Sequence, residues 1–172
     1  AMRYREYFGE QGGITLSGGE PLMQAEFVRE LFELSHKAGI NTCLDTSGVM
    51  FDRKQERLAK IDRLLEVCDL VMLESNHDEG MLRNGPYPYY LKRRILSDVG
   101  HLSNNACAET VAELLKSGTV RFFLGHLSRD NNFPELAYQT SLAALKSIGA
   151  VEGRDFFLEV NKIENDCGVI RF

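Results

Sequence analysis

The chain has 172 residues, of which 44% are hydrophobic, and this size and composition suit one domain with a buried core. Its formal net charge of −5 argues against general binding to nucleic acid or to an anionic membrane. No apolar run approaches the roughly 20 residues that span a bilayer, and the first residues are too polar for a signal peptide, so we expect a cytoplasmic protein.

Short apolar runs alternate with helical patterns along the chain. In chain order, the expected strands are residues 14–16, 40–44, 69–74, 119–124 and 155–160, with a short edge strand over 167–172. The first expected helix begins at Pro21 and ends at Gly39. The others cover residues 58–68, residues 91–96, the stretch from the caps at 103–105 to Gly118, and residues 134–148. The order predicts right-handed crossovers between parallel strands. We therefore expect residues 1–172 to form a single α/β domain, a three-layer sandwich of about five mostly parallel strands with helices on both faces.

Polar groups follow the expected strands. They are Ser17-Gly18-Gly19-Glu20, Asp45-Thr46, Glu74 with His77, and His126. In parallel sheets, ligands bind outside the carboxyl ends of the strands, so these residues are the candidates for a site. Adjacent glycines let a backbone approach a ligand closely. By contrast, His36 lies on a helix surface and we interpret it as solvated.

The four cysteines include no Cys-x-x-Cys pair, which disfavours a zinc ribbon or a dithiol redox motif. They are Cys43, Cys68, Cys107 and Cys167. We interpret them as reduced cysteines packed inside a cytoplasmic protein.

Residues from about 4 to 74 resemble the activating enzymes of glycyl-radical enzymes, notably pyruvate formate-lyase activase. The resemblance rests on residues 13–22, 24–29, 42–48 and 64–73. It implies that Gly18, Gly19 and Glu20 hold the amino group of S-adenosylmethionine. It also implies a monovalent-cation site beside the cofactor's carboxylate, formed by Asp45, Thr46, Met72 and Glu74, where Glu74 replaces the family's aspartate. The family binds a four-iron cluster through three cysteines upstream of Gly-Gly-Glu. No cysteine precedes Cys43 here, so we expect no iron–sulfur cluster.

From about residue 73 to 160, the chain resembles the C-terminal half of YycJ-type hydrolases of the metallo-β-lactamase superfamily. The resemblance rests on residues 74–78, 81–83, 87–88, 91–98, 100–104 and 124–132. It implies that His126 is the last metal-ligating histidine and that Glu74 and His101 form a catalytic pair near a scissile phosphate. Asp45 could replace the family's metal-bridging aspartate, so the candidate ligands for zinc or another divalent metal are Asp45, His77 and His126. The family's main His-x-His-x-Asp-His run is absent, which leaves too few ligands for a complete catalytic zinc site.

Three hypotheses stay open. The chain is a recombined α/β scaffold, joined near residues 69–78, with remnants of two enzyme sites and without full catalytic activity. Alternatively, it is a metal-dependent, phosphodiesterase-like hydrolase, or a radical-enzyme remnant that binds S-adenosylmethionine. In each case the expected partner is a small molecule, and the sequence leaves enzymatic activity and oligomeric state undecided.

Overall fold

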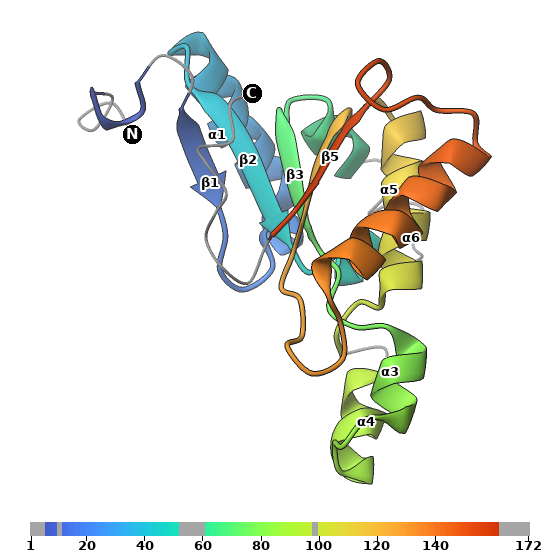
Figure 1. Cartoon of the computed structure of the whole chain (residues 1–172). Coiled ribbons are helices and arrows are strands. Elements are labelled where there is room, and N and C mark those ends of the chain that lie inside the picture. Colours follow the sequence, from blue (N-terminus) through green and yellow to red (C-terminus); the bar gives the residue numbers. More distant parts are fainter. Residues whose placement is uncertain (1–5, 10–11, 52–60, 98–99, 162–172) are drawn as a thin grey trace.

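The computed structural model describes residues 6–9, 12–51, 61–97 and 100–161, and its centre is a five-stranded sheet (Figure 1). The strands are β1 (Gly13–Leu16), β2 (Asn41–Thr46), β3 (Leu70–Glu74), β4 (Arg121–Gly125) and β5 (Phe157–Val160). They lie side by side in chain order, and every neighbouring pair is parallel. The α/β class and the five parallel strands are thus confirmed. Because the strands are parallel, all five end at the same edge of the sheet.

Helices connect the strands. They are α1 (Ala25–Lys37), α3 (Glu79–Asn84), α4 (Tyr89–Ile95), α5 (Asn104–Lys116) and α6 (Pro134–Ser147), with 3-10 turns at Pro21–Gln24 and Val49–Phe51. In Figure 1, α5 and α6 pack together beside the sheet, whereas α3 and α4 extend beyond the ends of the strands. Among the described helices, none is long and apolar enough to cross a membrane.

The hydrophobic core lies against one face of the sheet. Leu44, Val71, Phe122 and Leu158 are neighbours across β2, β3, β4 and β5, and all four are buried. They belong to one cluster with buried residues of α1, α5 and α6, such as Phe32. Alternate residues of a strand point to opposite faces of the sheet, so the register places these four side chains on the same face. The apolar faces of the helices pack against that face.

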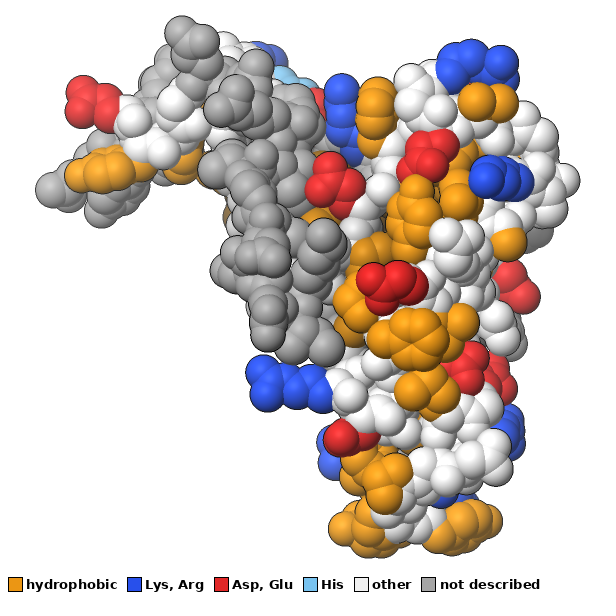
Figure 2. Space-filling view, viewed as in Figure 1, with side chains coloured by type: hydrophobic (Ala, Val, Ile, Leu, Met, Phe, Trp, Pro, Cys, Tyr) orange, Lys and Arg blue, Asp and Glu red, His pale blue; other side chains and the backbone are white. Residues whose placement is uncertain are grey.

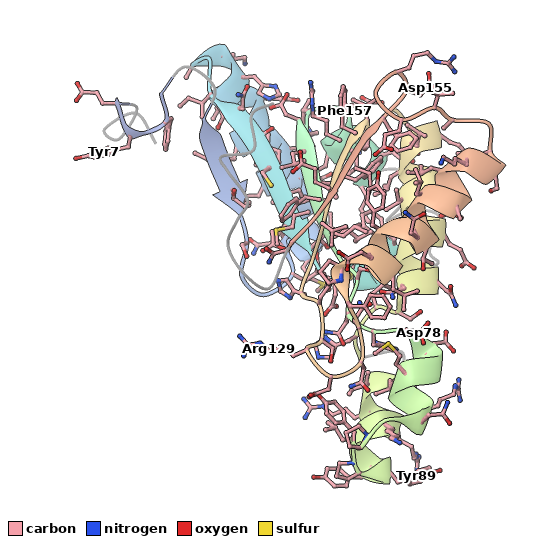
Figure 3. All side chains as sticks on the ribbon, in the orientation of Figure 1. Tyr7, Asp78, Tyr89, Arg129, Asp155 and Phe157 are labelled. Carbon is pink, nitrogen blue, oxygen red and sulfur yellow. The ribbon has the colours of Figure 1, made fainter. Side chains whose placement is uncertain are left out.

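The opposite face of the sheet is less covered by the described residues. Phe123 and Met72 are only partly buried there, and Phe157 is 50% exposed, with the guanidinium of Arg121 5.5 Å from its ring centroid (Figure 3). The described part of the chain therefore forms two layers, where the sequence predicted three with helices on both faces. The reason is the sequential strand order, since right-handed crossovers between successive neighbours keep every connection on the same side.

The helix α3 was not predicted from the sequence. Its cap is Asp78, whose Oδ1 accepts a 2.8 Å hydrogen bond from the backbone N–H of Met81 (Figure 3). The next helix, α4, begins at Tyr89, and Figure 2 shows hydrophobic side chains gathered at this end of the molecule, where Tyr89 is 76% exposed. Of the helix expected over 58–68, only residues from 61 onward are described, and the edge strand expected over 167–172 lies outside the described residues.

His36 is held in place, contrary to its expected solvation. Its Nε2 lies 2.8 Å from Oδ2 of Asp69, and the same carboxylate oxygen accepts a 2.8 Å hydrogen bond from the backbone N–H of Thr42. Asp69 precedes β3 and Thr42 belongs to β2, so this cluster ties the end of α1 to two strands.

Candidate functional site

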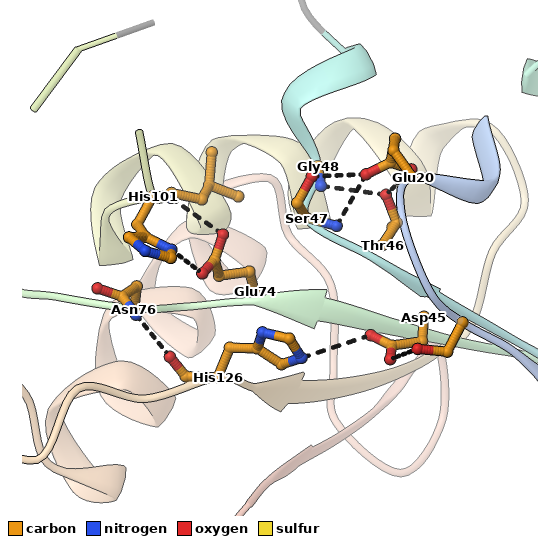
Figure 4. A network of polar contacts seen from close by, with 11 residues as sticks. Glu20, Asp45, Thr46, Ser47, Gly48, Glu74, Asn76, His101 and His126 are labelled. Atoms are coloured by element: carbon orange, nitrogen blue, oxygen red, sulfur yellow. Dashed lines mark hydrogen bonds and ion pairs between the residues drawn. The ribbon is translucent and has the colours of Figure 1, made fainter. Parts of the chain in front are cut away.

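Glu20 joins the ends of β1 and β2. Its Oε1 accepts hydrogen bonds from the hydroxyl of Thr46 at 2.6 Å and from the backbone N–H of Leu22 at 3.1 Å. Its Oε2 accepts from the backbone N–H of Ser47 at 3.0 Å and from the Ser47 hydroxyl at 2.5 Å (Figure 4). A carboxylate offers about four lone-pair positions, so these four bonds occupy Glu20 fully. Glu20 therefore fixes the turn and leaves little acceptor capacity for a ligand.

Gly18 and Gly19 give this turn an open backbone. Their φ angles are 94° and 61°, in the left-handed region that favours glycine. A Cβ added at either residue would meet no atom within 4 Å. The turn is consequently open to a ligand at the strand edge, and the Glu20 side chain that follows the two glycines is bonded to the end of β2.

Asp45 and His126 approach each other at the same edge. Oδ1 of Asp45 lies 3.9 Å from Nε2 of His126, while its Oδ2 accepts a 2.6 Å hydrogen bond from the Ser17 hydroxyl (Figure 4). His126 has a φ of 57°, unusual for a residue with a side chain, and its carbonyl accepts a 2.7 Å hydrogen bond from Asn76. Strained backbone of this kind is often concentrated at functional sites.

Glu74 contacts His101 rather than Asp45. Its Oε1 lies 2.6 Å from Nδ1 of His101, and its Oε2 accepts a 3.4 Å hydrogen bond from the backbone N–H of Leu102 (Figure 4). The Glu74 side chain is 3% exposed, whereas that of His101 is 53% exposed. The expected pair is therefore in contact, although its catalytic role stays a prediction. The cation ligands expected beside it have other partners, Asp45 with Ser17 and Thr46 with Glu20.

His77 lies apart from the Asp45–His126 pair and lines a cavity of about 620 Å³ together with His101. It is 1% exposed, and neither ring nitrogen has a hydrogen-bond partner in the part of the chain that is described. Burial lowers the pKa of the His77 imidazole below its ordinary value.

Three polar residues that the sequence analysis did not single out hold these segments together. Ser75, Asn104 and Asn132 form a buried hydrogen-bonded ring that joins the end of β3, the start of α5 and the loop after β4. Asparagines next to predicted loops were the available signal, but such residues are usually exposed turn formers.

Two of the three candidate metal ligands lie near each other in the structure. The structure brings Asp45 near His126, with His77 in the separate cavity. Among the described residues, no group of three or more His, Cys, Asp or Glu side chains is placed to hold a metal ion. Burial raises the pKa of the Cys43 thiol to about 11 and those of Cys68 and Cys107 to about 12, which disfavours the thiolates that bind metals.

The pKa of His77 leads to a prediction for stability. An unfolded histidine protonates near its ordinary pKa of 6.5, whereas folded His77 stays neutral to lower pH. The unfolded state then binds more protons, so the stabilising contribution of neutral His77 is complete above pH 6.5 and is lost as pH falls through its folded pKa. We expect the free energy of unfolding of the wild type, relative to a His77→Gln variant, to decrease by at most about 1.4 kcal/mol per pH unit as pH falls from 6.5 to the folded pKa, and to level off below it. Urea denaturation of both proteins from pH 7 to pH 5 measures this difference, and a constant difference would contradict the prediction.

Comparisons with known proteins give two kinds of relatives. Residues 1–84 match the Radical SAM superfamily. The chain is 44% identical over 93 residues to the exodeoxyribonuclease WalJ of Streptococcus pneumoniae, covering 54% of this chain and 35% of WalJ. It is 45% identical over 75 residues to the pyruvate formate-lyase-activating enzyme of Listeria monocytogenes, covering 43% of this chain and 30% of that enzyme.

Among solved structures, a domain of pyruvate-formate lyase-activating enzyme from Bacteroides vulgatus is 13% identical, with a TM-score of 0.46, and the match covers 87% of this chain and 98% of that domain. The chain itself spans about a third of the length of the two curated relatives. In its first 84 residues, the chain is therefore similar to radical SAM proteins.

Proposed function

We propose that this chain is a recombined α/β unit that binds S-adenosylmethionine at the Ser17–Glu20 turn without completing radical chemistry by itself. The observation that carries the proposal is the turn itself, with its two open glycines and its rigid attachment through Glu20. The match of residues 1–84 to the Radical SAM superfamily supports it. The seam near residues 69–78 and the cytoplasmic location belong to the same proposal.

Each residue of the turn has a specific role in this proposal. The peptide groups of Gly18 and Gly19 bind the amino group of the cofactor, because their surroundings are open. Glu20 acts as a positioning residue, since its four hydrogen bonds fix the turn against β2. His126, 57% exposed at the same edge, is available to the cofactor's carboxylate.

The residues present suit only one of the two groups that the radical SAM superfamily uses, S-adenosylmethionine and an iron–sulfur cluster. S-adenosylmethionine supplies an activated sulfonium, and the open turn suits its amino acid end. The three described cysteines, in contrast, do not fit an iron–sulfur cluster, because Cys43 and Cys107 are buried, Cys68 is partly buried, and all three have raised thiol pKa values. We therefore assign no reaction step to a cluster held by these three thiols.

A Glu20→Gln variant tests the proposal. A glutamine amide cannot accept hydrogen bonds with both of its end groups, so the bond from Ser47 or Thr46 is lost and the turn loosens. We expect isothermal titration calorimetry to show S-adenosylmethionine binding to the wild type that is weakened roughly tenfold to a hundredfold in the variant. Glu30→Gln, an exposed change on α1, serves as the control and should bind normally. Absence of binding to the wild type would reject the proposal.

A second candidate function, phosphodiester hydrolysis, is favoured by the 2.6 Å contact between Glu74 and His101. One partial relative is an exodeoxyribonuclease, and the pair has the buried carboxylate and exposed imidazole of an acid–base couple. Asp45 and His126 are the residues available to a metal there, fewer than the three protein ligands of a catalytic zinc site. An assay for phosphodiester cleavage with and without added zinc decides this candidate.

A further inference from the structure

The cavity that His77 lines includes no residue of the Ser17–Glu20 turn, although Ser47, a partner of Glu20, belongs to its wall. It has a volume of about 620 Å³, within the range of small-molecule sites, and its walls come from α3, the end of α4, residues 100–103 and α5. In Figure 1, α3 and α4 lie below α5, beyond the ends of the strands.

His77 supplies an unused hydrogen-bonding group at this cavity. Its imidazole is 1% exposed, and both ring nitrogens are without a partner among the described residues. The backbone is fixed, because the carbonyl of His77 accepts a 2.9 Å hydrogen bond from the N–H of Asn104. A buried polar group without a partner costs roughly 1–3 kcal/mol, so a ligand that bonds to this ring recovers that free energy.

The charges around the cavity favour a cation. Glu109 and Glu113 line it from successive turns of α5, and neither forms an ion pair with a residue in the described ranges. Two carboxylates at positions i and i+4 repel each other, and a cation between them relieves this repulsion. Arg83 lines the same cavity but already bonds to Glu79 at 3.2 Å.

Beside several serines and a threonine, apolar side chains form part of the remaining walls, among them Phe51, Ile95 and Leu102. They suit the hydrocarbon body of a ligand rather than a bare ion. A neutral imidazole has one nitrogen that accepts a hydrogen bond from an N–H donor, and neither ring nitrogen of His77 has a partner among the described residues.

We propose that this cavity binds a small organic amine, with its ammonium group between His77 and the carboxylates of Glu109 and Glu113 and its apolar body against Phe51, Ile95 and Leu102. None of the residues that hold the amine in this proposal belongs to the S-adenosylmethionine site proposed above.

Three matched probes test the proposal by isothermal titration calorimetry on the full chain. They are benzylamine, benzyl alcohol and benzoate, which share a ring and differ in charge. We expect benzylamine to bind, benzyl alcohol to bind more weakly and benzoate not to bind. The double variant Glu109→Gln/Glu113→Gln changes only exposed side chains and should weaken benzylamine roughly fivefold. His77→Leu removes the acceptor and should weaken it roughly tenfold.

The control variant is Glu159→Gln, which removes one negative charge at an exposed position of β5 and should leave benzylamine binding unchanged. The benzylamine titrations contain no S-adenosylmethionine, so failure here and failure of the S-adenosylmethionine proposal are distinguishable. The proposal is overturned if benzylamine gives no binding, if benzyl alcohol or benzoate binds equally well, or if the double variant binds like the wild type. The double variant keeps the test decisive even where His77→Leu does not fold.

Discussion

Replacing Asn132 by leucine is expected to lower the free energy of unfolding by about 3 kcal/mol, because the change breaks a buried amide network at its centre. The Asn132 side chain donates to the carbonyl of Ser75 at 2.8 Å and accepts from the Asn104 amide at 2.9 Å. It also accepts from the backbone N–H of Phe133 at 3.0 Å. Asn132 is 3% exposed and Asn104 is 2% exposed, so water cannot readily replace the lost partner.

Urea denaturation measures this effect, with Asn105→Leu as the control. Asn105 is the exposed neighbour of Asn104 on α5, and surface changes of this type stay within about ±0.5 kcal/mol. Because Asn104 and Asn132 share hydrogen bonds, the double variant Asn104→Leu/Asn132→Leu should cost less than the sum of the single changes. If Asn132→Leu were as stable as the control, the network would contribute nothing to the fold.

The network also explains why the site was only partly predictable. The apolar runs at Leu70–Leu73 and Arg121–Leu124 identify strands by their composition, and the polar residues after them mark the functional edge. Whether Asn104 caps a helix in solvent or closes a ring with Asn132 depends on a partner 28 residues away. Local sequence carries no information on that distance. The same holds for His36, whose partner Asp69 is 33 residues away.

The number of helix layers on the sheet could not be predicted from the sequence for a related reason. Helices cover one face or two according to the order of the strands, and the order is decided by which strands pair. Apolar runs such as Val71–Leu73 predict burial, but they do not say whether helices or other chain segments provide it. The helix α3 escaped prediction because its six residues include few apolar ones, although Asp78 was a usable cap signal.

The contact between Glu74 and His101, in contrast, was expected from the resemblance to metallo-β-lactamase-superfamily hydrolases and is present in the structure at 2.6 Å. The sequence offered two roles for Glu74, as a cation ligand and as the partner of His101, and the structure places its side chain against His101. Both of its oxygens are used at the His101 side, Oε1 by the imidazole and Oε2 by the N–H of Leu102. A cation beside Asp45 and Met72 would have to compete with this arrangement.

Removing His101 should reveal how much this pairing stabilises the fold. In His101→Ala, the Glu74 carboxylate, 3% exposed in the wild type, loses its imidazole partner and keeps only the long 3.4 Å bond from Leu102, which leaves a poorly compensated charge. Because His101 is 53% exposed, water partly replaces its ring, and we expect a loss of about 2 kcal/mol in the free energy of unfolding. Glu74→Gln should cost less, about 1 kcal/mol, since a neutral amide still bonds to the imidazole.

The double variant Glu74→Gln/His101→Ala separates pairing from simple truncation. Without a buried charge, the loss of the imidazole matters less, so the double variant should be more stable than the sum of the single losses predicts. Urea denaturation of the four proteins gives this coupling free energy, which we expect to be at least about 0.5 kcal/mol. Strict additivity would show that the 2.6 Å contact is not an energetic pair, and the hydrolase candidate would then lose its main structural support.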